Sequence, residues 1–260
     1  MAPNPVRTFK ADQLQVQVYS SQEDLSESIS QQVHAYLKER IQSQGSASAI
    51  LATGNSQIKF LARLVSLGGI DWSKVTLFHM DEYLGITPDH KASFRYYMRE
   101  RVESLVKPKV FHYLQGEALL PFDECERYTA LLKQQPIDLC CLGIGENGHL
   151  AFNDPPVADF NDRFWVKVLK LDDACKTQQM KEGHFATLEA VPPYALSLTI
   201  PALVSAKRLY CVAPEKRKAV PVKNALEGPI STDCPASILR KQAHCTLMLD
   251  QDSSALLSNG

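Results

Sequence analysis

Short apolar runs alternate along this chain with stretches in which apolar residues recur every three or four positions. A short continuous apolar run is typical of a strand buried on both faces, and the longer period is typical of a helix with one buried face. Their alternation predicts an α/β fold, namely a three-layer α/β/α sandwich with a Rossmann-like, mostly parallel sheet. The expected strands lie at residues 47–52, 75–80, 110–114, 137–142, 166–171, 195–200, 208–212 and 245–249.

Helical periods fall between these runs. Near the N-terminus, Ser20 or Ser21 can cap a helix, because Glu23 and Asp24 follow three residues later. No internal repeat, low-complexity tract or long linker divides the chain, so one domain is predicted over residues 1–260. Helical faces are expected over about residues 25–37, 58–65, 94–105, 125–132 and 216–226.

Composition narrows the class of protein. The chain is 45% hydrophobic and 22% charged with a formal net charge of −1, whereas general nucleic-acid or membrane-surface binders usually carry a basic excess. No apolar run approaches the ~18 residues that span a bilayer, and the N-terminus does not resemble a signal peptide. The seven scattered cysteines contain no C-x-x-C pair, so reduced thiols in a cytoplasmic protein are expected.

Polar or glycine-rich segments follow three of the predicted strands. In open α/β sheets, ligands bind beyond the carboxyl ends of the strands. The first segment is Thr53, Gly54, Asn55 and Ser56, which precedes a predicted helix. Hydroxyls, backbone N–H groups and a helix N-terminus suit a phosphate, although the same residue types also serve as ordinary turn and cap residues.

Two carboxylates, Asp81 and Glu82, come directly after the run at residues 75–80. Acidic groups at the end of a buried strand cost desolvation energy unless something uses them. Asp81 could act as a general base whose pKa is raised by burial, and the alternative is that Asp81 or Glu82 caps the next turn.

The third segment, at residues 143–156, combines three glycines with a histidine and an aspartate. The glycines permit close backbone approach, and His149 can exchange protons near neutral pH. Asp154 follows five residues later, where a carboxylate can orient and charge the imidazole.

In this order, the segments resemble the glucosamine-6-phosphate deaminase/isomerase family over about residues 47–250. The most specific likeness is at residues 143–155, which follow the family signature Gly-x-Gly-x-Asp-Gly-His-Ile-Ala-Phe-Asn-Glu-Pro. Four other blocks are similar to family segments, at residues 53–56, 78–83, 191–196 and 218–228.

The resemblance implies an enzyme that converts glucosamine 6-phosphate into fructose 6-phosphate and ammonia. Asp81 would move the C2 proton to C1, His149 would assist ring opening, and Asn147 and Asp154 would flank the histidine as further catalytic residues. The substrate and its phosphate would contact Thr53, Gly54, Asn55, Ser56, Glu82, Gly148 and Lys218.

The resemblance also limits the partners. No metal or organic cofactor is expected, because the C2 proton of a 2-amino aldose is acidic enough for acid–base catalysis. The expected partner is a small phosphosugar, with no nucleic acid and no membrane, and the chain could act as a monomer or a homo-oligomer.

Three departures from the family pattern stand out. Asn147 replaces an acidic residue, and Asp154 is one methylene shorter than the family glutamate, so His149 would be held less strongly as a cation unless Glu146 compensates. The family's phosphate-binding arginine has no match, with Gln179 or Lys181 nearest. A lid is expected over about residues 160–190, without the residues of the allosterically activated members.

Other functions remain open at this point. The asparagine at 147 also resembles galactosamine-6-phosphate deaminases. The related 6-phosphogluconolactonases carry a Gly-His segment too, but with different residues after the histidine. A third alternative is a sugar-phosphate sensor that has lost catalysis.

Overall fold

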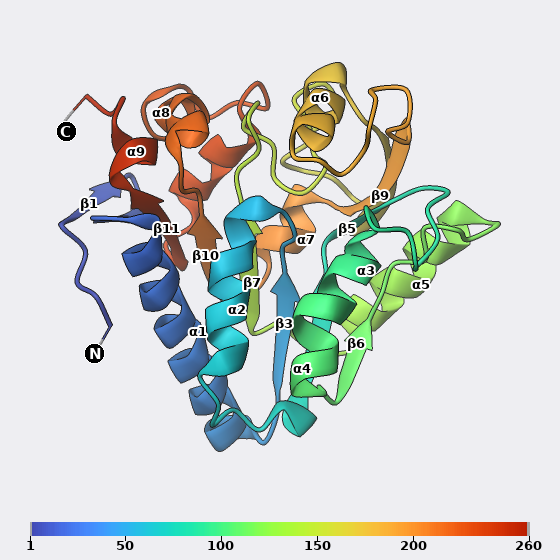
Figure 1. Ribbon diagram of the computed structural model, residues 1–260, viewed down its shortest axis with the longest axis horizontal. Helices are drawn as coiled ribbons and strands as arrows, with labels where there is room; N and C mark the ends of the chain where they lie inside the picture. The colour runs from blue at the N-terminus through green and yellow to red at the C-terminus, as the bar shows by residue number, and fades with distance from the viewer. Residues whose placement is uncertain (1, 259–260) are drawn as a thin grey trace.

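The structure, a computed structural model, describes residues 2–258, so positions 1, 259 and 260 of the domain expected over residues 1–260 lie outside it. Within this range, eight strands form the central sheet in the order β1-β2-β11-β10-β7-β3-β4-β6 (Figure 1). Their bounds are β1 (Arg7–Ala11), β2 (Leu14–Tyr19), β3 (Ala47–Leu51), β4 (Val75–His79), β6 (Val110–His112), β7 (Leu139–Gly143), β10 (Arg208–Val212) and β11 (Cys245–Asp250).

The sheet is almost entirely parallel. Every neighbouring pair runs parallel except β1 and β2, which form an antiparallel hairpin at one edge. The predicted α/β fold class with a mostly parallel sheet is therefore confirmed.

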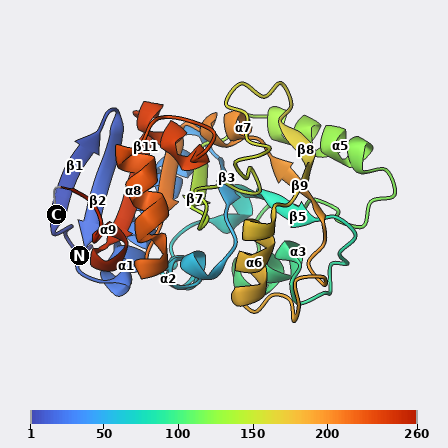
Figure 2. The same cartoon turned by 90° about the horizontal axis from the view of Figure 1, so that it is seen from above.

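Helices cover both faces of this sheet (Figures 1 and 2). Side chains of α1, α2, α3 and the π-helical turn after α3 pack on one face, while those of α5, α7 and α8 pack on the other. The helices are α1 (Gln22–Gln44), α2 (Ile58–Ser66), α3 (Phe94–Met98), α4 (Ser104–Val106), α5 (Pro121–Lys133), α6 (Asp173–Lys181), α7 (Ile200–Val204), α8 (Ala219–Glu227) and α9 (Gln251–Ser254).

Burial on both faces explains why the central strands are continuously apolar. In β7, Leu139 and Cys141 face the core under α1 and α2, while Cys140 and Leu142 face the opposite core. Because successive strand residues point to opposite sides, each position needs an apolar side chain when both faces are covered. All four are fully buried.

A second, smaller sheet was not foreseen. It has the order β5-β9-β8 and is antiparallel throughout. The runs at residues 166–171 and 195–200 do form strands, but they pair with each other and with the Asp-Glu-Tyr segment rather than joining the central sheet. The bounds are β5 (Asp81–Tyr83), β8 (Val166–Lys170) and β9 (Tyr194–Leu198).

The structure shows how two of the predicted helices begin. Of the two candidate caps of α1, Ser21 is the one used, since its Oγ accepts a hydrogen bond from the N–H of Asp24 at 3.1 Å. The helix expected at residues 216–226 begins with a 3₁₀ turn (Lys216–Lys218) and continues as α8. Over residues 2–258, no helix combines the length and apolar character that crossing a membrane requires.

Candidate active site

The candidate site lies where the strand order of the central sheet reverses. From β3 the chain proceeds outward to β4 and β6, then returns to β7 beside β3 and proceeds the other way to β10 and β11. The loops after β3 and β7 therefore separate and leave a crevice beyond the carboxyl ends of these strands. Viewed from above, α6 lies beside the carboxyl ends of the central strands (Figure 2).

The loop after β3 forms one wall of the pocket. Thr53, Gly54, Asn55 and Ser56 all line it. Gly54 has φ 101° and ψ 165°, a conformation that a side chain would strain. A 3₁₀ turn and then α2 follow, so backbone N–H groups at the start of a helical segment are available to an anion at this wall.

Asp81 lies at the start of β5 and lines the same pocket. It is 6% exposed, and its Oδ1 has no hydrogen-bond partner among the described residues. Burial, followed by the charge of Glu82, raises the pKa of Asp81 well above its ordinary value. A buried carboxylate with a free oxygen and a raised pKa is suited to accept a proton from a bound molecule.

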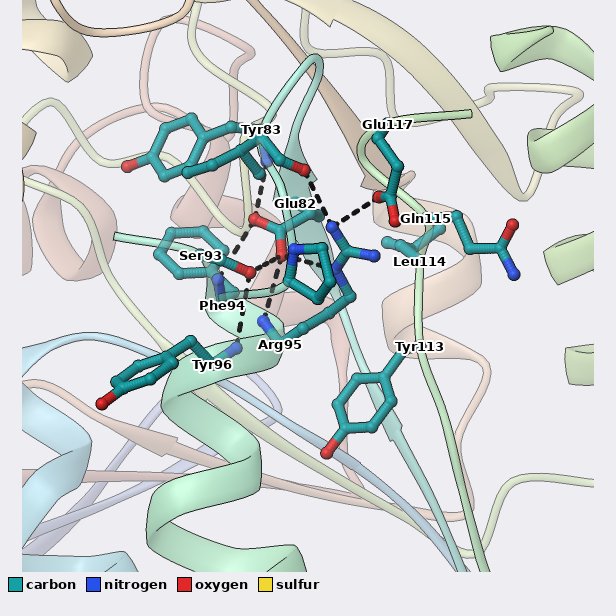
Figure 3. Close-up of polar contacts among 12 residues, drawn as sticks. Glu82, Tyr83, Ser93, Phe94, Arg95, Tyr96, Tyr113, Leu114, Gln115 and Glu117 are labelled. Atoms are coloured by element: carbon teal, nitrogen blue, oxygen red, sulfur yellow. Dashed lines mark hydrogen bonds and ion pairs between the residues drawn. The ribbon is translucent and has the colours of Figure 1, made fainter. Parts of the chain in front are cut away.

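Glu82 does not line the pocket, and its carboxylate lies among hydrogen-bond donors of neighbouring segments (Figure 3). It is fully buried, and its oxygens accept hydrogen bonds from the hydroxyl of Ser93 and from the backbone N–H groups of Tyr83, Phe94 and Arg95. Its Oε2 also lies 3.3 Å from Nε of Arg95. Glu82 thus holds the N-terminus of α3 against β5, and the structure does not bring it to the predicted substrate contacts.

His149 reaches the pocket with a carboxylate behind it. Its Nδ1 lies 2.9 Å from Oδ1 of Asp154, and Asp154 is fully buried. Burial alone would raise the pKa of Asp154, but the attraction of His149 and the hydrogen bonds of its neighbours lower that pKa overall. The pair therefore has the geometry of an imidazole oriented by an ionised carboxylate.

Gly145 makes room for the His149 ring, and Gly148 permits close packing against Cys234. A Cβ on Gly145 would lie 2.3 Å from the Cε1 and Nε2 atoms of the His149 ring, and a Cβ on Gly148 would lie 2.7 Å from Sγ of Cys234. Gly148 also has a φ of 86°. Gly148 lies behind the pocket wall rather than on it.

Asn147 also lies behind His149 rather than in the pocket. Its Nδ2 donates to Asp154 and its Oδ1 accepts the backbone N–H of His149. Glu146 does not compensate for the lost charge, because its Oε1 lies 3.3 Å from Nη1 of Arg217 instead.

Two adjacent cations also line the pocket, and the part that they line is called its cationic end. Lys218 is 3% exposed, and burial together with the neighbouring charge of Arg217 lowers its pKa to about 8. Arg217 is half-buried and pairs with Glu146, Glu182 and Glu215. A cationic end of this kind suits an anionic group such as phosphate.

The pocket also contains residues that the sequence analysis did not assign. Arg217 was missed although it adjoins Lys218, and Glu182 and Gln178 were missed because α6 shows no clear apolar stripe. Gln179 and Lys181 lie nearest in sequence to the place of the family's phosphate-binding arginine. Gln179 lines the pocket and accepts a hydrogen bond from the hydroxyl of Tyr83 at 2.7 Å, whereas Lys181 does not line it.

One group of potential metal ligands borders the site. Single ligand atoms of His149, Asp154 and Cys175 lie within 4.8 Å of one another. Burial raises the pKa of the Cys175 thiol well above its ordinary value, which opposes formation of the thiolate that metals bind. Both oxygens of Asp154 already accept hydrogen bonds, so the residues present fit an acid–base pair better than a metal centre.

The fold and the site together define an α/β protein with a polar pocket for a small anionic molecule at its switch point. The family model described as glucosamine-6-phosphate isomerases/6-phosphogluconolactonase matches residues 20–248. This chain belongs to that family.

Known relatives support this assignment. The chain is 38% identical over 190 residues to a glucosamine-6-phosphate deaminase of Exiguobacterium sibiricum, covering 73% of each chain. It is 32% identical over 245 residues to the enzyme of that name from Bacillus cytotoxicus, covering 94% of this chain and 90% of the other.

Solved structures share the fold. One described as a monomeric glucosamine-6-phosphate deaminase superposes with a TM-score of 0.86 at 30% identity, covering 93% of this chain and 99% of the other. A 6-phosphogluconolactonase from Trypanosoma brucei has a TM-score of 0.75 at 17% identity, covering 97% and 100%. At that lower identity the likeness concerns the fold alone.

Proposed function

We propose that this chain is a glucosamine-6-phosphate deaminase, an enzyme that forms fructose 6-phosphate and ammonia from glucosamine 6-phosphate and water. The observation that carries the proposal is the convergence of Asp81, His149 and Lys218 on one pocket with the loop at residues 53–56. A proton acceptor, an oriented imidazole and an anion-binding end are the three elements that the reaction needs. Relatives that are 32–38% identical bear this enzyme name.

The cationic end of the pocket supports binding of the substrate phosphate. Residues 53–56, with their hydroxyls and backbone N–H groups, line the same pocket as Lys218. Arg217 lies beside Lys218. It would supply the second phosphate contact, for which the sequence suggested Gln179 or Lys181. A phosphate dianion would compete with Glu182 for its guanidinium.

His149 then serves ring opening. An imidazole held by Asp154 can transfer a proton between the ring oxygen and the C1 hydroxyl of the sugar. The open chain has an aldehyde at C1 and an amine at C2, so the C2 proton becomes acidic.

Asp81 carries the isomerisation. Its free oxygen removes the C2 proton, and the electron pair of the C2–H bond forms a double bond between C1 and C2 while the π pair of the C1 carbonyl moves to O1, which takes a proton from water. The same C2 proton then returns to C1 as the amine lone pair forms a double bond to C2, which leaves an iminium group there. Water adds to this carbon, the C2–N bond breaks, and ammonia and the ketone of fructose 6-phosphate are released. Proton transfer by a positioned group contributes about 10² to 10⁴ in rate.

A cytoplasmic location is part of the same proposal. All seven cysteines are free thiols and buried, which is the usual state of cysteines in a reducing compartment. Separation of cell fractions followed by detection of the protein tests this point.

The decisive experiment measures ammonia and fructose 6-phosphate from glucosamine 6-phosphate. Galactosamine 6-phosphate, N-acetylglucosamine 6-phosphate and 6-phosphogluconolactone are assayed beside it. We expect turnover of glucosamine 6-phosphate with the highest kcat/KM. Faster hydrolysis of the lactone, or binding of hexose phosphates without turnover of any amino sugar, would overturn the proposal.

The role of Asp81 is tested by Asp81→Asn. We expect kcat to fall by about 10² to 10⁴-fold with little change in KM, because the amide cannot accept the C2 proton. The matched control is Asp89→Asn, which removes a carboxylate that is exposed and pairs with Arg99 outside the pocket. Full activity of Asp81→Asn would remove this residue from the mechanism.

A further inference from the structure

The amide of Asn147 joins two carboxylates that belong to different segments. Its Nδ2 lies 3.0 Å from Oδ1 of Asp154 and 3.3 Å from Oδ2 of Asp172. Its Oδ1 accepts a hydrogen bond from the backbone N–H of His149 at 3.1 Å. All the polar atoms of the amide group are therefore engaged.

These contacts fix the orientation of the amide. A backbone N–H can only donate, so the oxygen of Asn147 must face His149 and the nitrogen must face the two carboxylates. A carboxylate at this position would have no hydrogen to offer Asp154 or Asp172. The asparagine is thus matched to the presence of Asp172.

Asp172 is also the N-cap of α6. Its Oδ1 accepts the N–H of Cys175 at 2.6 Å, which leaves Oδ2 for Asn147. Its own backbone N–H points to Oδ2 of Asp154 at 3.5 Å. Asp172 therefore contacts the carboxylate behind His149 both directly and through Asn147.

The same helix reaches the other end of the pocket. Gln178, Gln179 and Glu182 line the pocket from α6 and the residue after it, and Glu182 pairs with Arg217 beside Lys218. The start of α6 thus contacts the acid–base pair, and its end contacts the cationic end.

We propose that Asp172 is a positioning residue that acts with Asn147 as one unit to hold Asp154, and through it the imidazole of His149, in place. The effect on turnover rests on the proposed deaminase function, while the positioning of His149 does not. Because Asp172 caps α6, the orientation of His149 then depends on where α6 lies.

A reciprocal exchange tests the unit. Asn147→Asp places two acceptors against each other across the contact with Asp172. Asp172→Asn places two donors there, since the Oδ1 of the new amide is needed to cap α6. The double variant restores one donor and one acceptor with the roles reversed.

We expect each single variant to lower kcat about tenfold, with KM changed by less than about twofold, because neither residue lines the phosphate end of the pocket. The double variant is expected to recover at least about threefold over Asn147→Asp. Recovery stays partial because its new carboxylate faces Asp154. Additive losses in the double variant would overturn the proposal.

Capping is separated from positioning by the choice of substitution. Asparagine caps helices about as well as aspartate. If Asp172 only capped α6, the kcat of Asp172→Asn would therefore be unchanged. Asp173→Asn is the matched control, because Asp173 is the exposed neighbour in the first turn of the same helix. We expect it to behave as the unmodified chain.

A second readout needs no substrate. The ring-proton NMR signals of His149 are identified by their loss in His149→Gln and compared at one pH. We expect both single variants to displace them, the double variant to move them back, and Asp173→Asn to leave them unchanged. If the unmodified chain shows no deaminase activity, the proposed function fails, and these signals still decide the positioning role.

Discussion

At the residue scale, the pocket depends on charged side chains whose surroundings change their protonation. Asp81 has a raised pKa because it is buried next to Glu82, and Lys218 has a lowered pKa because it is buried next to Arg217. Both shifts come from contacts made only in the folded chain.

The pKa of Lys218 predicts how substrate capture depends on pH. The lysine is cationic below its pKa of about 8 and neutral above it. We therefore expect kcat/KM to fall as the pH rises through about 8, because the neutral amine loses its attraction for phosphate. A pH series of kcat/KM measures this, and Lys218→Arg, which stays cationic, should move the fall to higher pH. An unchanged profile in that variant would assign the fall to another group.

Gly145 provides a steric test of the His149 position. In Gly145→Ala the added Cβ would lie 2.3 Å from the imidazole, so the ring must move. We expect kcat to fall roughly 10- to 100-fold, since displacement of a catalytic group by about 1 Å can cost this much. Gly68→Ala is the control, because it strains a glycine with positive φ that has nothing near its Cβ position. Equal effects of the two variants would contradict the steric argument.

At the scale of elements, β5 is held by its contacts with α3. Its three residues pair with β9, and the buried carboxylate of Glu82 collects donors from the start of α3. The base at Asp81 is adjacent in sequence, so these contacts also determine where that side chain points.

Glu82→Gln is expected to lower stability rather than substrate affinity. The new amide turns an N–H₂ group toward donors that now lack an acceptor, which costs about 1–3 kcal/mol of unfolding free energy. Urea unfolding measures the loss. Glu117→Gln is the control, since Glu117 is half-exposed where it pairs with Arg95, and such pairs contribute little. A raised KM at unchanged stability would instead make Glu82 the substrate contact that the resemblance implies.

At the scale of the whole molecule, the pocket joins the two halves of the sheet. The loops after β3 and β4 come from one side of the switch point, and those after β7 and β10 from the other. The lid expected over about residues 160–190 contains α6, and its closure over a bound phosphosugar stays a proposal.

A ligand that contacts both halves should stabilise the native chain. At a concentration 100-fold above its Kd, fructose 6-phosphate should add ~2.7 kcal/mol, or roughly 5 to 10 °C in Tm for a chain of this size. Thermal unfolding measures the shift, and fructose without phosphate is the control ligand. Lys218→Gln should lose most of the shift. Equal shifts with both ligands would show that phosphate is not what the pocket binds.

Continuous apolar runs carry enough information to predict the central strands. Residues 47–52 and 75–80 match β3 and β4 within one residue, because strands buried on both faces need apolar side chains throughout. β2 was missed because two glutamines alternate with its apolar residues, so it contains no continuous apolar run. β5 was missed because two of its three residues are acidic.

The sequence by itself determined the α/β class, the three loops at strand ends and the candidates Asp81 and His149. These features depend on local pattern and residue type, while Lys218 became a candidate through the family resemblance. Only the tertiary structure decided that Glu82 supports α3, that Arg217 and α6 border the pocket, and that Asn147 joins Asp154 to Asp172. Those contacts join residues 7 to 71 positions apart, and their geometry follows from how the strands and helices pack rather than from any local sequence pattern.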